Sequence, residues 1–172
     1  MKTLIISTLL VCAFSFGIFA ESSRFIKEDT ASQSSFEYLL SLYYNVKDAL
    51  VNSDPSAAAS KADELVNAIQ KIDIKSLTAT EHKAFMPLQD KLSADAKDIS
   101  QSKDLAKQRI YFASLSDNFY SLAKAVKLST EPIYYDYCPM KKHYWLSSES
   151  KIQNPYYGKA MPTCGEVQET IK

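Results

Sequence analysis

Several residue types that build enzyme active sites are scarce in this sequence. Its 172 residues include only three glycines, three cysteines, two histidines and one tryptophan. The sequence contains no glycine-rich phosphate loop, Gly-x-Ser-x-Gly turn, His-Glu-x-x-His helix or Cys-x-x-Cys-His haem attachment. A nucleophilic pair could be drawn between Cys138 and His143, but no third group orients it. We therefore predict that the protein is not an enzyme.

An excess of charge of either sign is also missing. Lys and Arg together number 20, and Asp and Glu together number 20. Binding to nucleic acid requires clustered Lys and Arg that meet the phosphates, and binding to anionic membranes requires a similar basic field. The composition therefore predicts that the protein binds neither.

The one long apolar run lies at the N-terminus, in MKTLIISTLLVCAFSFGIFA. A single lysine, a short apolar stretch and a final Ala20 predict a signal peptide over residues 1–20, so we expect a periplasmic or secreted protein. Cys12 follows Leu9-Leu10-Val11, but valine before the cysteine fits a lipoprotein signal poorly, and we favour simple export. Cleavage would leave about 150 residues, the size of one domain, with no membrane span.

Apolar residues at steps of three and four predict four helices between residues 34 and 129, after a flexible polar leader at 21–33. Ser34 and Asp54 are expected to begin the first two helices, and Thr78 with Glu81 forms a capping box for the third. Pro87 is expected to kink or split that third helix. Short connections between helices predict an antiparallel, up-down four-helix bundle, so the expected fold class is all-α.

Residues 130–172 have a different character. They hold four of the six prolines, six of the eleven tyrosines and the only tryptophan, Trp145. Proline and glycine argue against a long helix, and dense aromatics argue against disorder. We predict an ordered, irregular segment packed on the bundle, with Gln108 and Arg109 of the fourth helix as its anchor.

This C-terminal segment concentrates soft metal donors. Thiolate, thioether and imidazole groups are the donors that Cu(I) favours, and thiolate with imidazole also suits Zn(II). The candidate metal ligands are Cys138, Met140, His143, Met161 and Cys164. Trp145 and the tyrosines would form a water-excluding shell around them.

Plainer interpretations of the same residues remain open. In an oxidising compartment Cys138 and Cys164 could form a disulfide, closing a loop of about 26 residues worth roughly 3–4 kcal/mol. Met140 and Met161 could fill gaps under the aromatics, and His143 could bond locally. The run Asn154-Pro155-Tyr156-Tyr157-Gly158 could then be a rigid turn that presents tyrosines to a partner.

The C-terminal motifs carry a family resemblance. The run Cys138-Pro139-Met140, then Trp145, then Asn154-Pro155-Tyr156-Tyr157-Gly158 and Met161-x-x-Cys164-Gly165 resembles a family of exported bacterial domains of unknown function. Members stand alone or are fused to periplasmic adaptor subunits of copper/silver-type heavy-metal efflux pumps. Cys-Pro-Met also resembles the Cys-Pro-Met-His-Pro element of such pumps, although here Lys141 and Lys142 precede the histidine.

The resemblance implies the handling of a soft metal. Together with the donors it predicts a protein that binds Cu(I), with Ag(I) or Zn(II) less favoured, and acts in metal buffering or in delivery to a periplasmic efflux adaptor protein. The alternative is a disulfide-stapled interaction module of the cell envelope without metal. The oligomeric state does not follow from the sequence.

Overall fold

The computed structural model describes the backbone of residues 22–172 and the side chains from residue 35 onward. The predicted signal peptide at 1–20 lies outside the described residues. Four helices come first: α1 (Ser22–Val51), α2 (Pro55–Gln70), α3 (Ala79–Gln101) and α4 (Leu105–Ala125). Three strands follow: β1 (Ile133–Cys138), β2 (His143–Ser147) and β3 (Glu166–Ile171). Two short 3-10 turns, η1 (Ile74–Ser76) and η2 (Gly158–Ala160), complete the elements.

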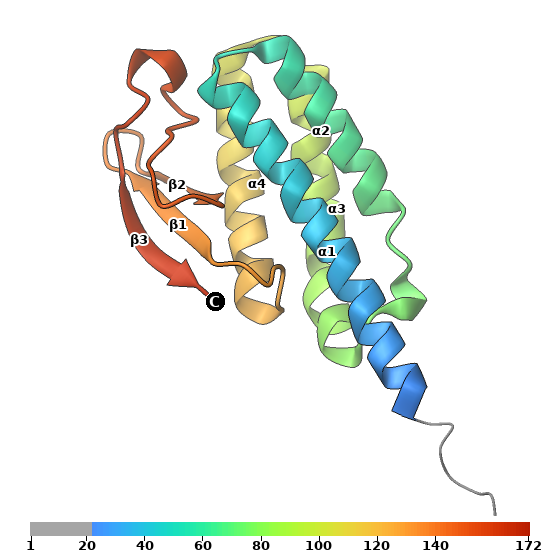
Figure 1. Ribbon diagram of the computed structural model, residues 1–172. Coiled ribbons are helices and arrows are strands. Elements are labelled where there is room, and N and C mark those ends of the chain that lie inside the picture. Colours follow the sequence, from blue (N-terminus) through green and yellow to red (C-terminus); the bar gives the residue numbers. More distant parts are fainter. Residues whose placement is uncertain (1–21) are drawn as a thin grey trace, which may run out of the picture.

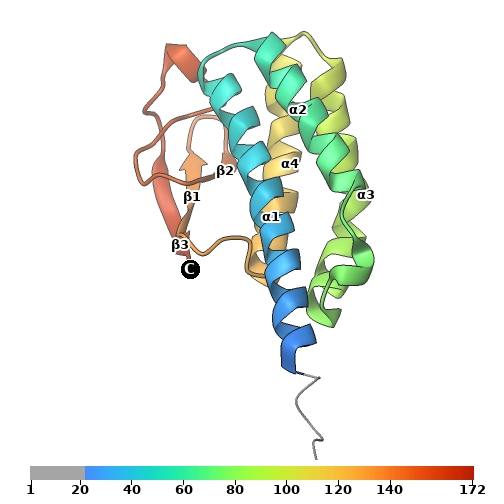
Figure 2. The same cartoon turned by 45° about the vertical axis from the view of Figure 1, so that its right-hand side comes forward.

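The helices form the expected up-down bundle, in which each helix packs on the next one along the chain. Figures 1 and 2 show the sheet on the side of the bundle formed by α1 and α4, with α2 and α3 on the opposite side. Strand β2 packs directly on α4. Within residues 22–172, none of the helices combines the length and apolar character that a membrane crossing requires.

The helix boundaries agree largely with the capping signals. The Asp54 side chain accepts a hydrogen bond from the Ala57 N–H at 2.9 Å, with Pro55 in the first helical position. Thr78 and Glu81 form the predicted capping box. Helix α3 runs unbroken through Pro87, so the predicted split is wrong. The chain is helical from Ser22, ahead of the expected start at Ser34.

The apolar faces of the four helices meet in one core. Tyr43 is fully buried and stacks on Phe112 of α4 with ring centroids 5.2 Å apart. Gln108 on the inner face of α4 is also fully buried, as is Ser116 of the same helix. Its amide nitrogen donates to the carbonyl oxygens of Pro55 at 2.9 Å and Ser102 at 2.8 Å. These carbonyls satisfy the N–H groups of the buried amide, whereas its Oε1 has no hydrogen-bond partner among the described residues.

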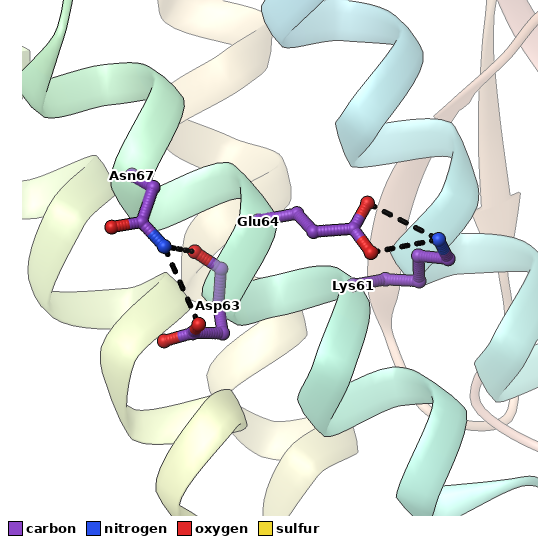
Figure 3. A network of polar contacts seen from close by, with 4 residues as sticks. All are labelled: Lys61, Asp63, Glu64 and Asn67. Carbon is purple, nitrogen blue, oxygen red and sulfur yellow. Dashed lines mark hydrogen bonds and ion pairs between the residues drawn. The ribbon is translucent and has the colours of Figure 1, made fainter.

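The carboxylates of α2 lie on the solvent side and pair with neighbours on the same helix. Figure 3 shows Lys61 Nζ at 2.8 Å from Glu64 Oε1, and the Asn67 amide donating to the backbone oxygen of Asp63 at 2.9 Å. Such exposed pairs three or four residues apart stabilise a helix by a few tenths of a kcal/mol. They form a solvated helix face.

The C-terminal segment corrects the predicted all-α class. It contains a three-stranded antiparallel sheet in the order β2-β1-β3, where an irregular segment was expected. The sequence does not reveal these strands, because each is only five or six residues long and borders proline- or glycine-containing stretches. Tyrosine and isoleucine nevertheless favour strands, since their side chains pack well on a pleated surface.

Arg109 joins this segment to the bundle. Its Nε donates to the carbonyl oxygen of Pro155 at 2.8 Å, and its Nη2 donates to the Leu50 carbonyl at 3.3 Å and to Ser53 Oγ at 3.2 Å. The predicted anchor is therefore confirmed for Arg109. It is wrong for Gln108, whose bonds stay within the bundle.

Candidate functional site

The two cysteines of the C-terminal segment come together at one end of the sheet. Cys138 ends β1, and Cys164 stands two residues before β3 begins. Tyr137 pairs with Glu166 in the antiparallel ladder, so the chain on either side of this pair brings the two cysteines close. Both are free thiols. Burial raises the pKa of the Cys164 thiol, and the charge of Cys138 and a hydrogen bond with its side chain raise it further.

Backbone contacts hold this thiol pair in place. Asn154 is fully buried, and its amide nitrogen donates to the Cys164 carbonyl at 2.5 Å. Its side-chain oxygen accepts from the N–H groups of Tyr156 at 2.8 Å and Tyr157 at 3.1 Å. On the other strand the Lys142 N–H donates to the Cys138 carbonyl at 2.7 Å and closes the β1–β2 turn. The two sulfur-bearing residues are thus fixed from both sides.

An aromatic wall lies beside the thiol pair. Trp145 is fully buried, and its ring meets that of Tyr156 edge-on at 5.9 Å. A Cβ at Gly165 would lie only 2.8 Å from Trp145 Cη2, so the backbone next to Cys164 approaches the indole more closely than any side chain would permit. Tyr156 is buried and its hydroxyl donates to the Tyr144 carbonyl. The idea that the Asn-Pro-Tyr-Tyr-Gly run presents Tyr156 outward is therefore wrong.

The other three predicted ligands lie around the thiol pair at more exposed positions. Met140 lies in the β1–β2 turn with 60% of its surface exposed, and Met161 precedes Cys164 with 37% exposed. His143 is the cross-strand partner of Cys138, but its exposed ring packs on Tyr156 with centroids 5.3 Å apart. The structure thus brings Cys138 and Cys164 together and leaves both methionines at the surface.

The donor set decides which metals this arrangement suits. Within residues 35–172 no group of three or more His, Cys, Asp or Glu side chains could hold a metal ion. A structural zinc site needs four such ligands in a tetrahedron, so the geometry does not fit one. Two adjacent thiols flanked by surface thioethers instead fit a soft monovalent ion such as Cu(I), which thiolate and thioether sulfur select.

A buried carboxylate that the sequence reasoning missed lies on the same strand. Asp136 is fully buried, and neither of its carboxylate oxygens has a hydrogen-bond partner among the described residues. Burial raises its pKa to about 7, against the opposing charge of Lys47. The cross-strand partner of Asp136 is Trp145, whose Nε1 is likewise buried and has no hydrogen-bond acceptor among the described residues. The sequence could indicate that Asp136 is buried only if residues 133–138 were first assigned to a strand, because only then does the position face the interior.

A model of one protein family matches residues 39–131, more than half of the chain. The chain belongs to the family described as Protein of unknown function (DUF3347). The match covers the helical bundle from within α1 onward and ends just before β1, so all five predicted ligands of this DUF3347 chain lie outside it. No curated protein and no solved structure matches the chain.

Proposed function

We propose that this DUF3347 protein is an exported, non-enzymatic protein that binds a soft metal ion, first of all Cu(I), at Cys138 and Cys164. The observation that carries the proposal is the proximity of these two thiols, which are 26 positions apart in the sequence yet flank the paired residues Tyr137 and Glu166, close enough for Cys138 to raise the pKa of Cys164. Thiolate pairs are strong ligands for Cu(I). Ag(I) would follow the same chemistry, and Zn(II) is less favoured.

The electrostatics of the pair support binding by proton displacement. The pKa of the Cys164 thiol is raised, partly because a second ionised sulfur beside it would be repelled. A bound cation would replace the proton of the Cys164 thiol and remove the repulsion between the two sulfurs. Met140 and Met161, exposed within three residues of the thiols, would supply thioether donors from the surface, with His143 as an optional fifth ligand.

The predicted signal peptide supports a periplasmic or secreted location. The resemblance to domains fused to efflux adaptors supports a role in buffering metal or delivering it to a periplasmic efflux adaptor protein. Two exposed methionines next to a buried thiol suit such transfer, because an incoming partner can reach the thioethers first.

A competition titration with a Cu(I) chelator tests this function on the reduced protein. We expect the wild type to bind one Cu(I), and Cys138→Ser/Cys164→Ser to lose affinity by at least 100-fold, since oxygen is a poor Cu(I) ligand. Met140→Leu/Met161→Leu should weaken binding by about tenfold, in the range seen for supporting ligands. Met86→Leu, which changes a methionine of α3, serves as the matched control. Equal Cu(I) uptake by the wild type and the double-serine variant would rule the proposal out.

The same proximity favours a second function, a disulfide-stapled interaction module of the cell envelope. Oxidation would join Cys138 to Cys164 and close a loop worth roughly 3–4 kcal/mol. A free-thiol count on protein taken directly from its native compartment separates the two. Two reactive thiols per chain support the metal site, and none supports the staple.

A further inference from the structure

A cavity of about 240 Å³ opens beside the thiol pair, between α4 and the β1–β2 hairpin. Its lining differs from that of an ordinary core void, because the side chains of Arg109 and Lys141 carry a positive charge and the His143 ring adds polar nitrogens. No carboxylate lines it, although Asp117 nearby interacts electrostatically with His143. The remaining lining is apolar and comes from Ala106, Ile110 and Tyr156.

One exposed large apolar side chain lines this pocket, and another lies in the turn next to it. Ile110 is 65% exposed and lines the pocket, and Met140 is 60% exposed and directly precedes Lys141. Exposed apolar side chains that gather beside a concave surface mark sites where another molecule binds. Ile110 thus gives the pocket an exposed apolar wall.

The charge around the pocket is unbalanced in a chain that is neutral overall. Lys141, Lys142 and Lys159 are exposed at this end of the molecule, and Arg109 lies beneath them. Lys141 Nζ is held 5.1 Å above the Tyr157 ring, which positions its ammonium group without neutralising it. A positive rim around an apolar floor is complementary to a negative ligand that has an apolar part.

We propose that this pocket, defined by Arg109, Ile110, Lys141 and His143, is the docking site for an acidic peptide segment of a partner protein that inserts an aliphatic side chain. At about 240 Å³ the cavity is smaller than the usual 300–1,000 Å³ of small-molecule sites and suits one or two side chains. A carboxylate of the segment would meet the ammonium group of Lys141, and its aliphatic side chain would pack on Ile110 and Tyr156. The proposal extends the proposed function, since His143 is the cross-strand partner of Cys138 and a docked segment would lie beside the metal site.

Peptide binding to the full-length mature protein tests the proposal. The probe is a fluorescein-labelled five-residue peptide in which Glu or Asp alternates with Leu, measured by fluorescence anisotropy against a counterpart with Lys in place of the acids. We expect the acidic peptide to bind at least tenfold more tightly than the basic one, and to weaken at least tenfold between 50 mM and 500 mM salt.

Two surface variants locate the binding site. Lys141→Glu and Ile110→Ser should each weaken acidic-peptide binding at least tenfold, because one reverses a rim charge and the other removes the apolar contact. Lys83→Glu, the same charge change at an exposed position of α3, should leave it within twofold. All three residues are exposed, so folding is preserved.

The copper experiment and the peptide experiment can fail separately. Cys138→Ser/Cys164→Ser should keep peptide binding, and Ile110→Ser should keep Cu(I) affinity. No binding of the acidic peptide at millimolar concentration, equal binding of the basic peptide, or unchanged binding by Lys141→Glu would each overturn the docking site while leaving the metal site standing.

Discussion

Replacing Gly158 by alanine should release the C-terminal segment from the helical bundle. Gly158 has a φ of +55°, and a Cβ there would lie 2.3 Å from Ser53 Oγ, 2.5 Å from Arg109 Nη2 and 2.8 Å from the Leu50 carbonyl oxygen. None of these three atoms belongs to a freely moving group, because Arg109 donates hydrogen bonds to the other two. The methyl group would therefore displace the guanidinium that anchors the segment.

The free energy of unfolding should fall by about 3 kcal/mol. The left-handed backbone costs an alanine about 1 kcal/mol, and losing a charge-assisted hydrogen bond of Arg109 costs about 1.5–3 kcal/mol more. Urea unfolding followed by far-UV circular dichroism measures this change. Fluorescence of Trp145, the only tryptophan, reports on the sheet and should change at lower urea concentration than the helical signal.

Two further variants test whether the loss of stability comes from displacing Arg109 and not from any substitution in this turn. Lys159→Ala changes an exposed side chain in the same 3-10 turn and should alter stability by no more than about 0.5 kcal/mol. Gly158→Ala/Arg109→Ala should cost clearly less than the sum of its single changes, because both remove the same anchor. A Gly158→Ala protein within 0.5 kcal/mol of the wild type would refute the argument about steric displacement.

Three smaller changes test other parts of the structure by urea unfolding. Tyr43→Phe should cost about 1–3 kcal/mol, because the buried Leu146 N–H donates to the Tyr43 hydroxyl at 3.0 Å and would lose its acceptor, whereas the exposed Tyr38→Phe should be neutral. Thr78→Ala should cost about 1 kcal/mol by removing the cap of α3, and a cost below about 0.3 kcal/mol would contradict the capping-box role. Burial raises the pKa of Asp95, so the folded protein binds its proton more tightly than the unfolded chain and loses that stabilisation as pH rises. Asp95→Asn should therefore show a smaller fall in stability than the wild type as the pH rises above about 4, the usual pKa of Asp, and equal slopes would contradict this sign.

The helical part of the fold could be predicted because its signals are local and repeated. The apolar face of α1 recurs over several turns, and Asp54-Pro55 and Thr78 with Glu81 define helix starts within four residues of sequence. The strands could not be predicted in the same way. The run Ile-Tyr-Tyr-Asp-Tyr-Cys of β1 shows no clean alternation of polar and apolar residues, since its tyrosines are half-buried and its one carboxylate faces the interior.

Composition alone could predict that the two cysteines form a pair, but not the geometry of the site around them. Two cysteines left after export suggest a pair, and the structure places their thiols in contact. The direction of the His143 ring depends on strand register, which a sequence of this length does not reveal. The role of Asn154, whose amide supports Cys164, could have been suspected from its position before Pro155, because asparagine commonly organises turns of this kind.

The segment that joins the two cysteines also contains the anchor to the bundle. Gly158 and Pro155 lie between Cys138 and Cys164, and both meet the side chain of Arg109. A metal ion or a covalent bond between the two sulfurs would therefore close a ring of residues 138–164, and Arg109 already attaches this ring to α4. We expect such closure to slow hydrogen exchange of the Gly158 amide, which donates to the Asn154 carbonyl at 2.9 Å. Metal binding or oxidation at the two cysteines would then change the local stability next to the helix ends, although no helix moves.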